Sequence, residues 1–155
     1  MGQSGFYKNG AVCTGCNACQ IACKDNHDLP LGVNIRTVRA EERMENGSVR
    51  VQFHPVACRH CANALCAGVC PTGALSVYVD STVGYDEALC SGCGKCVKVC
   101  PFHQISQPAQ GHRIYKCDGC YERRLQGKNP VCVDACPVHY LGFKNGLCRK
   151  EGAEQ

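Results

Sequence analysis

The hydrophobic and polar positions of this 155-residue chain predict short strands and short helices. Residues 35–39 and 49–53 both alternate between apolar and polar side chains, which is typical of half-buried strands. The turn-forming sequence Glu45-Asn46-Gly47 lies between them, so the pattern predicts a β-hairpin insertion over residues 31–57. Two interpretations of this hairpin stay open: a flap over the rest of the protein, or a docking surface for a partner.

A second hairpin is predicted by residues 73–79 and 83–86, with its turn at Asp80 and Ser81. The remaining predicted elements are short strands at residues 6–7, 103–106, 112–116 and 140–143, a helix that continues past Cys23 to about His27, and a helix at residues 118–126. Residues 144–155 are polar and are expected to be frayed.

Hydrophobic residues make up 45% of the chain, but this figure includes 17 cysteines, and there are only 4 Phe and no Trp. Such an apolar core is thin for this length, so disulfides or inorganic centres must help to hold the fold. An odd number of cysteines suits a complete disulfide set poorly. The repeated C-x2-C spacing suits metal ligation better, so we expect reduced thiols that bind metal.

Sixteen of the cysteines form an internal repeat of four groups, and each group ends in C-x3-C. Group one is Cys13, Cys16, Cys19 and Cys23; group two is Cys58, Cys61, Cys66 and Cys70; group three is Cys90, Cys93, Cys96 and Cys100; group four is Cys117, Cys120, Cys132 and Cys136. Proline follows the closing cysteine in groups two, three and four, whereas Lys24 follows it in group one.

Group three has the spacing of a bacterial ferredoxin that binds [4Fe–4S] clusters. Its first three thiolates lie on one tight loop and hold one cluster, while the fourth points away and reaches a second cluster. Gly92 and Gly94 allow the loop to approach the cluster closely, and Pro101 ends the helix. Zinc is the rival metal, because group four taken alone suits a zinc site equally well. Groups one and three place three cysteines in seven residues, which is awkward for a single tetrahedral zinc ion.

The order of cysteine loop, short helix and hairpin occurs twice along the chain. The sequence therefore predicts an α+β fold of two tandem bacterial-ferredoxin-like modules related by a pseudo-twofold, with the β-hairpin as an insertion. Groups two and three form an inner module at residues 58–111, groups one and four form an outer module at residues 1–30 and 112–145, and residues 146–155 form a tail. Each closing cysteine is expected to cross to the partner group.

The formal charge of +4 counts every cysteine as neutral. Four thiolate-ligated clusters would add enough negative charge to make the loaded protein mildly acidic. The basic balance therefore does not indicate nucleic-acid binding.

The sequence shows no catalytic nucleophile, general base pair or substrate pocket, so the chain is not expected to be an enzyme by itself.

The chain resembles the four-cluster iron–sulfur electron-transfer subunits of the dimethyl sulfoxide reductase and formate dehydrogenase family of molybdopterin oxidoreductases. The likeness extends from about Phe6 to Phe143. The motifs that carry it are Cys13-Thr-Gly-Cys-Asn-Ala-Cys-Gln-Ile-Ala-Cys-Lys-Asp25, Cys58-Arg-His-Cys61 with Cys66, Cys70 and Pro71, and Lys116-Cys-Asp-Gly-Cys-Tyr121 with Cys132, Cys136 and Pro137.

This resemblance implies cross-linked ligation of four [4Fe–4S] clusters. The implied sets are Cys13, Cys16, Cys19 and Cys136 for cluster 1; Cys58, Cys61, Cys66 and Cys100 for cluster 2; Cys90, Cys93, Cys96 and Cys70 for cluster 3; and Cys117, Cys120, Cys132 and Cys23 for cluster 4. Nitrate-reductase-like relatives lose one ligand in the third group and hold a [3Fe–4S] centre, whereas group three keeps all four cysteines here.

The resemblance also implies a function, which is to relay electrons between a molybdopterin- or tungstopterin-containing catalytic subunit and another redox partner. That second partner would be a membrane anchor, a hydrogenase-type subunit or a soluble carrier. A free-standing polyferredoxin is the alternative, and a zinc-stapled binding module is a more remote one. No stretch approaches the ~18 apolar residues of a membrane helix. The chain is also expected to lack the C-terminal extension with which some longer relatives dock onto or enter the membrane, so no direct membrane span is expected.

The N-terminus lacks a signal pattern, which favours the cytoplasm, with the periplasm reached only by co-export with a partner.

Several residues outside the ligand sets carry further expectations. Cys148 is expected to be incidental, and His60, His103 and His139 are expected at the surface or behind the ligands. Two interpretations stay open for Lys95, Lys98 and Lys116: they raise a cluster potential, for which Lys116 is the best candidate, or they are solvated. Arg123, Arg124 and Lys128 form either a docking patch or a solvated helix face.

Overall fold

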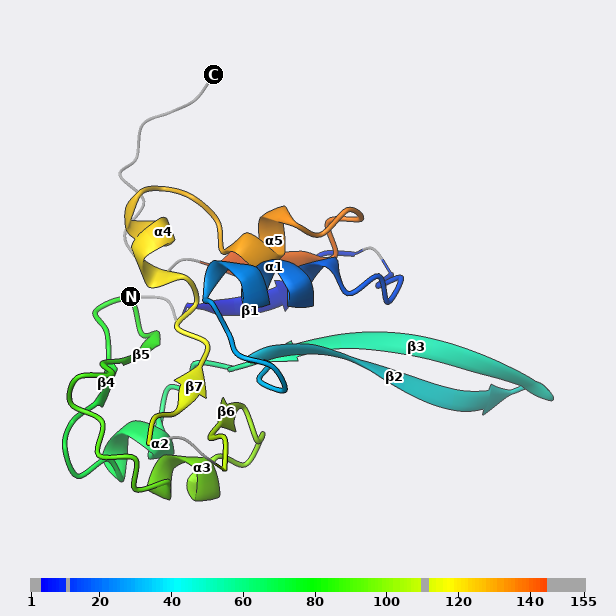
Figure 1. The fold of residues 1–155 in the computed structure, drawn as a ribbon. Helices are drawn as coiled ribbons and strands as arrows, with labels where there is room; N and C mark the ends of the chain where they lie inside the picture. Colours follow the sequence, from blue (N-terminus) through cyan, green and yellow to red (C-terminus); the bar gives the residue numbers. More distant parts are fainter. Residues whose placement is uncertain (1–3, 11, 110–111, 145–155) are drawn as a thin grey trace.

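The structure is a computed structural model that describes residues 4–10, 12–109 and 112–144. Within these residues the strands form four two-stranded antiparallel sheets, and only one helix exceeds five residues (Figure 1). In chain order the elements are β1 Gly5–Lys8, α1 Ala18–Asn26, β2 Arg36–Glu45, β3 Ser48–Ala57, α2 Leu65–Gly68, β4 Leu75–Val77, β5 Val83–Tyr85, α3 Lys95–Val99, β6 Ile105–Ser106, β7 Tyr115–Lys116, α4 Tyr121–Leu125, α5 Val131–Asp134 and β8 Leu141–Lys144.

The two ends of the described chain meet in one layer. β1 pairs with β8, with Phe6 opposite Phe143, and α1 packs against α5. Figure 1 shows the blue N-terminal segment beside the orange C-terminal one. The α+β fold is thus present, and group one lies beside group four. The boundaries of the outer module stay a prediction.

The middle of the chain forms a second layer, green in Figure 1. α2 packs against α3, β4 pairs with β5, and β6 pairs with β7. A small apolar core is built from buried residues of these elements: Ala64, Leu75, Val83, Cys96, Ile105 and Ile114. β7 packs on this layer through its pairing with β6, although it lies beyond the predicted boundary of the inner module at residue 111.

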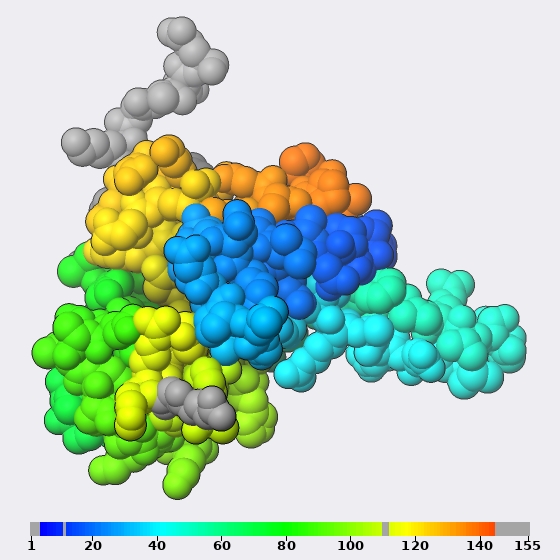
Figure 2. Space-filling model, viewed as in Figure 1, coloured from blue at the N-terminus to red at the C-terminus, as the bar shows by residue number. Residues whose placement is uncertain are grey.

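The hairpin of β2 and β3 is longer than the alternating residues predicted, because backbone pairing continues from Arg36 opposite Ala57 out to Glu45 opposite Ser48. Its base packs on the cysteine-rich core through Val38 and Ala57, as a flap would. Its tip projects away from the body (Figures 1 and 2). The docking interpretation therefore stays a prediction.

All four cysteine loops share one backbone feature. The third residue of each C-x2-C has a left-handed conformation: Gly15 (φ 73°), His60 (φ 48°), Gly92 (φ 69°) and Gly119 (φ 71°). A left-handed residue reverses the direction of the chain and so tightens each loop. Glycine adopts it without steric cost, which explains three of the four positions.

Gly92 is the position where a side chain is excluded most strongly. A Cβ atom there would lie 2.2 Å from the backbone oxygen of His112. We expect Gly92→Ala to cost about 1–3 kcal/mol from the left-handed backbone, plus the clash. The measurement is the guanidinium midpoint for loss of bound iron under anaerobic conditions. Gly68→Ala is the matched control, since no atom lies within 4 Å of its Cβ. Equal midpoints for the two variants would contradict this prediction.

The helix predicted at residues 118–126 is shorter than expected. It begins at Tyr121, because Gly119 and Cys120 both have positive φ and belong to the cysteine loop. The Asp118 carboxylate accepts hydrogen bonds from the backbone N–H groups of Cys120 (2.8 Å) and Tyr121 (3.3 Å) and so fixes this start. Of the segment predicted to be frayed, residues 144–155, Lys144 is instead the last residue of β8. The rest of it, Cys148 and the predicted tail at residues 146–155 included, lies outside the described residues. Among the helices of the described residues, none combines the length and hydropathy that a membrane crossing requires.

Candidate iron–sulfur sites

The sixteen cysteines of the four groups are all free thiols within the described residues. A disulfide scaffold therefore does not hold these groups. Most of the thiols are buried or half-buried, and only Cys16 and Cys93 are exposed. The groups lie in the cores of the two layers, where the apolar side chains are few.

Group one lies against the closing cysteine of group four. Cys19 and Cys136 belong to one buried cluster, with Cys13 packed against it. Burial raises the pKa of the Cys19 thiol. The thiols that raise it further are Cys13, Cys136 and Cys16. These four residues are the set that the family resemblance implied for cluster 1.

The closing cysteine of group one lies in turn against group four. Cys23 and Cys117 share a second buried cluster. Burial raises the pKa of the Cys23 thiol strongly, and the thiols that add to the effect are Cys117, Cys132 and Cys120. α1 therefore presents Cys19 to one set of thiols and Cys23 to another.

The closing cysteine of group two lies beside group three. One small cavity is lined by Cys70 together with Cys90, Cys93 and Cys96. Cys70 receives hydrogen bonds from the loop that follows it, and these outweigh the effect of burial and lower its pKa. The remaining inner thiols also gather. Burial raises the pKa of Cys66, and both Cys58 and Cys100 are among its charged neighbours.

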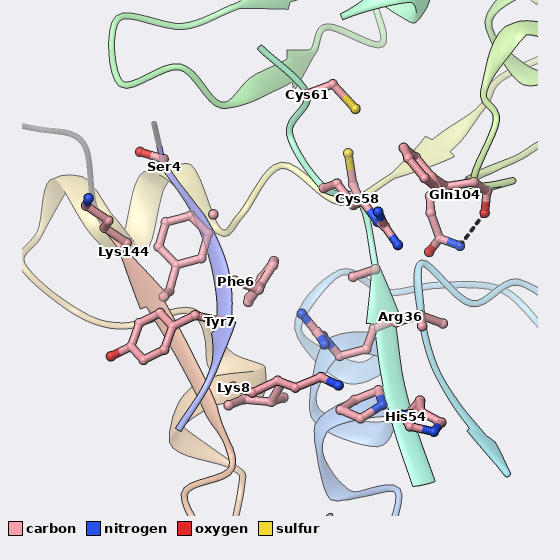
Figure 3. Close-up of a pocket in the computed structure, with 18 of the residues that line it drawn as sticks. Ser4, Phe6, Tyr7, Lys8, Arg36, His54, Cys58, Cys61, Gln104 and Lys144 are labelled. Atoms are coloured by element: carbon pink, nitrogen blue, oxygen red, sulfur yellow. Dashed lines mark hydrogen bonds between the residues drawn. The ribbon is translucent and has the colours of Figure 1, made fainter. Parts of the chain in front are cut away.

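Cys58 and Cys61 line a cleft of about 1870 Å³ between the base of the hairpin, β1 and β8. Figure 3 shows their sulfur atoms pointing toward one another. The described residues of the lining include no carboxylate, whereas its cations are Lys8, Arg36, Arg39, Arg59, Arg124 and Lys144. Group two therefore lies at a positively charged opening.

The turns after the closing cysteines direct backbone N–H groups at the sulfur. Gln104 donates to Cys100 Sγ at 3.4 Å, and Tyr140 donates to Cys136 Sγ at 3.2 Å. His103 and His139 precede these donors, and both have positive φ and exposed side chains. Both lie in the turn with exposed side chains, which is the first of the two positions expected for them, at the surface or behind the ligands.

His60 has the second of the two expected positions, since it is completely buried and lies beside a thiol of group four. Its Nδ1 accepts a hydrogen bond from the backbone N–H of Val83 at 3.1 Å, so the proton lies on Nε2, which is 4.0 Å from Cys117 Sγ. Burial lowers the pKa of His60 to about 3, and the nearby cations Lys116 and Arg124 lower it further. A neutral His60 on the group two loop thus directs an N–H toward a thiol of group four.

The lysines behave differently from one another. Lys95 and Lys98 are exposed and lie in solvent. Lys116 is buried, and its ammonium donates to the backbone oxygens of Val83 (2.5 Å) and Cys117 (2.6 Å). Of the three candidates named from the sequence, Lys116 alone is placed inside the protein beside a group four thiol.

The prediction that Arg124 is part of a docking patch or a solvated helix face is wrong. Arg124 is 3% exposed and forms a buried ion pair with Asp80. Burial opposes the charge on Asp80, but hydrogen bonds from Thr82 and Arg124 outweigh it and lower the Asp80 pKa. The neighbouring Arg123 pairs with Asp134 at 2.9 Å in a more exposed position. Lys128 is exposed.

Two residues near the thiols were missed from the sequence. His27 Nε2 lies 3.7 Å from Cys120 Sγ and 3.9 Å from the Asp118 carboxylate. Arg36 is buried beside groups one and four. Both follow group one in loops or strands without cysteine, so no ligand spacing marks them. The alternating pattern of β2 had suggested only a strand.

The thiols and their surroundings fit [4Fe–4S] clusters. Burial raises the pKa of Cys117 to about 12, and raises the pKa of Cys96, Cys120 and Cys132 to about 11. Thiols held in this way ionise when a metal binds them, because the metal charge replaces the lost solvation. The buried Arg36 adds to the fit, since its Nε and Nη2 have no hydrogen-bond partner and a negatively charged cluster would compensate them.

Comparison with known proteins identifies the same chemistry. One 4Fe-4S dicluster domain family matches residues 49–145, and a second matches residues 12–74. Together the two matches include all four groups. The [4Fe–4S] cofactor type and the pairing of ferredoxin-like domains are therefore confirmed, and the zinc alternative is wrong.

Similar proteins include subunits of reductases. The B subunit of anaerobic dimethyl sulfoxide reductase from Haemophilus influenzae is 38% identical over 152 residues, which is 92% of this chain and 74% of the relative. Thiosulfate reductase electron transfer subunit PhsB of Salmonella typhi is 42% identical over 135 residues (84% and 70%). Protein NrfC of Escherichia coli is 37% identical over 149 residues (91% and 65%).

The reductase relatives are the electron-transfer partners of a catalytic subunit, so the expectation that this chain relays electrons and is not catalytic alone is confirmed. The loops, the thiol groups and the matches lead to one assignment: the chain belongs to the iron–sulfur electron-transfer subunits of molybdopterin oxidoreductases, the family that includes the B subunit of dimethyl sulfoxide reductase.

Proposed function

We propose that the chain holds four [4Fe–4S] clusters and connects a molybdopterin- or tungstopterin-containing catalytic subunit to a second redox partner. Each bound cluster takes up and gives back one electron. The sets of ligands would be Cys13, Cys16, Cys19 and Cys136; Cys58, Cys61, Cys66 and Cys100; Cys90, Cys93, Cys96 and Cys70; and Cys117, Cys120, Cys132 and Cys23.

The observation that carries this proposal is the exchange of closing cysteines. Cys136 packs with the group one thiol Cys19, and Cys23 packs with the group four thiol Cys117. In the inner layer Cys70 lines a cavity with three group three thiols. Two-cluster ferredoxins exchange their closing cysteines in this way, so two such pairs support a count of four.

The chain's own residues bind the clusters, fix their positions and exclude water from them. The left-handed loop residues place thiols in pairs, and the backbone N–H groups of Gln104 and Tyr140 point at the closing sulfurs. N–H donors near a thiolate favour the more negative, reduced state. Burial disfavours the more negative, reduced state of a cluster. The balance between burial and N–H donors at each site therefore sets its reduction potential.

The first test is the metal and sulfide content of the chain purified anaerobically. We expect about sixteen iron and about sixteen sulfide per polypeptide, as four [4Fe–4S] clusters require. About eight of each would support only two clusters and contradict the proposed count. The control is the same protein after chelation of iron in denaturant, which should lose both iron and sulfide and should not refold without them.

The partner is tested by purification from the native source. A stable complex with a second polypeptide that carries a pterin cofactor and molybdenum or tungsten supports the proposal. A monomer that carries iron and sulfide but no catalytic subunit would favour the alternative of a free-standing polyferredoxin. The relatives favour the complex, since two of their names describe subunits of reductases.

A further inference from the structure

Arg36 is a buried cation with unused hydrogen-bond donors. It is the first residue of β2, its relative exposure is 2%, and neither Nε nor Nη2 has a hydrogen-bond partner. Its guanidinium carbon lies 4.2 Å from the centroid of the Phe6 ring. Among the ion pairs of the described part of the chain, none includes Arg36. Figure 3 shows the side chain extending between β1 and the base of the hairpin.

The position of Arg36 is fixed from both sides. Gln20, between Cys19 and Cys23 on α1, accepts a hydrogen bond at 3.1 Å from the backbone N–H of Val38. Across the hairpin Arg36 lies opposite Ala57, which packs on the core that contains Cys23. The strand is therefore tied to the helix that presents one thiol to each of the two outer sites.

The electrostatic neighbours of Arg36 come from both outer sites. The thiols on which its charge acts are Cys19, Cys23, Cys117 and Cys132. Cys19 belongs to the proposed cluster 1 set, and the other three belong to the cluster 4 set. A single guanidinium thus faces two proposed clusters at once.

An unpaired cation in this position is unfavourable unless a negative charge compensates it, because burial removes its hydration. Neutral thiols do not supply that charge. A thiolate-ligated cluster does, and its sulfur atoms accept hydrogen bonds. The unused donors of Arg36 therefore match the acceptors that two outer clusters would bring.

We propose that Arg36 is the shared counter-cation of the two outer clusters, donates hydrogen bonds to their sulfur atoms, and raises the reduction potentials of both. This inference rests on the proposed ligand sets. Reduction adds one negative charge to a cluster, and a nearby buried cation stabilises that charge. An arginine suits this role because its guanidinium does not lose its proton in a protein.

Arg36 differs in this respect from the lysines that the sequence singled out. Lys95 and Lys98 are screened by solvent, and the ammonium of Lys116 already donates to two backbone oxygens. The Nε and Nη2 donors of Arg36 are buried and have no hydrogen-bond partner, so its charge is screened less than that of an exposed lysine.

The experiment uses the full chain, loaded with clusters anaerobically, as wild type and as the variants Arg36→Gln, Arg36→Lys and Arg50→Gln. Arg50 is the control, since its substitution removes the same charge from the same hairpin at a side chain that is 70% exposed. Iron and sulfide are measured first, which tests the proposed cluster count independently. A redox titration followed by electron paramagnetic resonance then gives each potential, with signals assigned by variants that lack one closing cysteine.

For Arg36→Gln we expect both outer potentials to fall, so that the ratio of reduced to oxidised cluster at a fixed potential drops at least tenfold, which is about 59 mV for one electron. The inner potentials and those of Arg50→Gln should stay at the wild-type values. Unchanged outer potentials, or an equal fall at all four clusters, would overturn the proposal.

If Arg36→Gln loses the outer clusters, the iron content of Arg36→Lys decides whether the site needs the positive charge. If Arg36→Lys then keeps all the iron, with outer potentials nearer to wild type, the positive charge is what the site needs and the proposal is supported. If Arg36→Lys loses the same iron, the side-chain shape and not its charge holds the site, and the proposal fails. In either case the wild-type iron count still reports separately on the four-cluster function.

Discussion

Replacing Cys23 by alanine is expected to remove the cluster of group four and to leave the cluster of group one in place. The reason is that Cys23 packs with Cys117, although its neighbours in sequence belong to group one. The iron content should fall by one cluster, from about sixteen to about twelve per polypeptide. This is one of the two largest effects that we expect, since a lost cluster also removes part of the scaffold.

A pair of double variants distinguishes crossed from local ligation. If Cys23 and Cys120 hold the same cluster, Cys23→Ala with Cys120→Ala should lose no more iron than either single variant. Cys23→Ala with Cys19→Ala should lose two clusters, because those thiols belong to different sets. Residues that act as one unit are non-additive in this way. The reverse pattern would contradict the crossed assignment, and Cys148→Ala serves as the cysteine control with unchanged iron.

Replacing Arg124 by methionine is expected to weaken the protein by about 3–5 kcal/mol, because it leaves the buried Asp80 carboxylate unpaired. Asp80 is fully buried, and Arg124 also donates to Gly119 O at 2.8 Å and Thr82 Oγ1 at 3.2 Å. These contacts join the group four loop to the turn between β4 and β5. The measurement is the guanidinium midpoint at which the clusters are lost.

The matched control is Arg123→Met, one residue earlier in the same helix. Its ion pair with Asp134 is partly exposed, so its loss is expected to cost at most about 1 kcal/mol. The double variant Arg124→Met with Asp80→Leu removes both charges and should recover much of the lost stability. A similar midpoint for the Arg123 and Arg124 single variants would show that the buried pair does not join the two layers.

Several features could be predicted because they depend on residues close together in the chain. The cysteine spacing predicted the metal, and Gly92 and Gly94 predicted a tight loop that the left-handed backbone bears out. The hairpin was found from its alternating residues, although its strands extend further than the pattern. These signals come from residues that are close together in the chain, so they can be recognised in a single sequence without the structure.

Other features depend on contacts between distant segments and left no local mark. Arg124 was assigned to the surface together with Arg123, because adjacent arginines look alike in a sequence. Only the approach of Asp80, 44 positions away, makes one of them a buried ion pair. Arg36 likewise carried no signal, since a cation at the start of an alternating strand normally lies in solvent.

By itself, the sequence determined the chemistry of this protein: sixteen thiols at ferredoxin spacing, a thin apolar core and loops that turn where glycine permits. The tertiary structure alone decided which cations reach those thiols. It buries the cations Arg36 and Lys116 and the neutral N–H donor His60 against them, and it leaves Lys95 and Lys98 in solvent. The physical reason is that ligand spacing is a property of short loops, whereas burial of a charge is decided by the segments that pack on it from elsewhere in the chain.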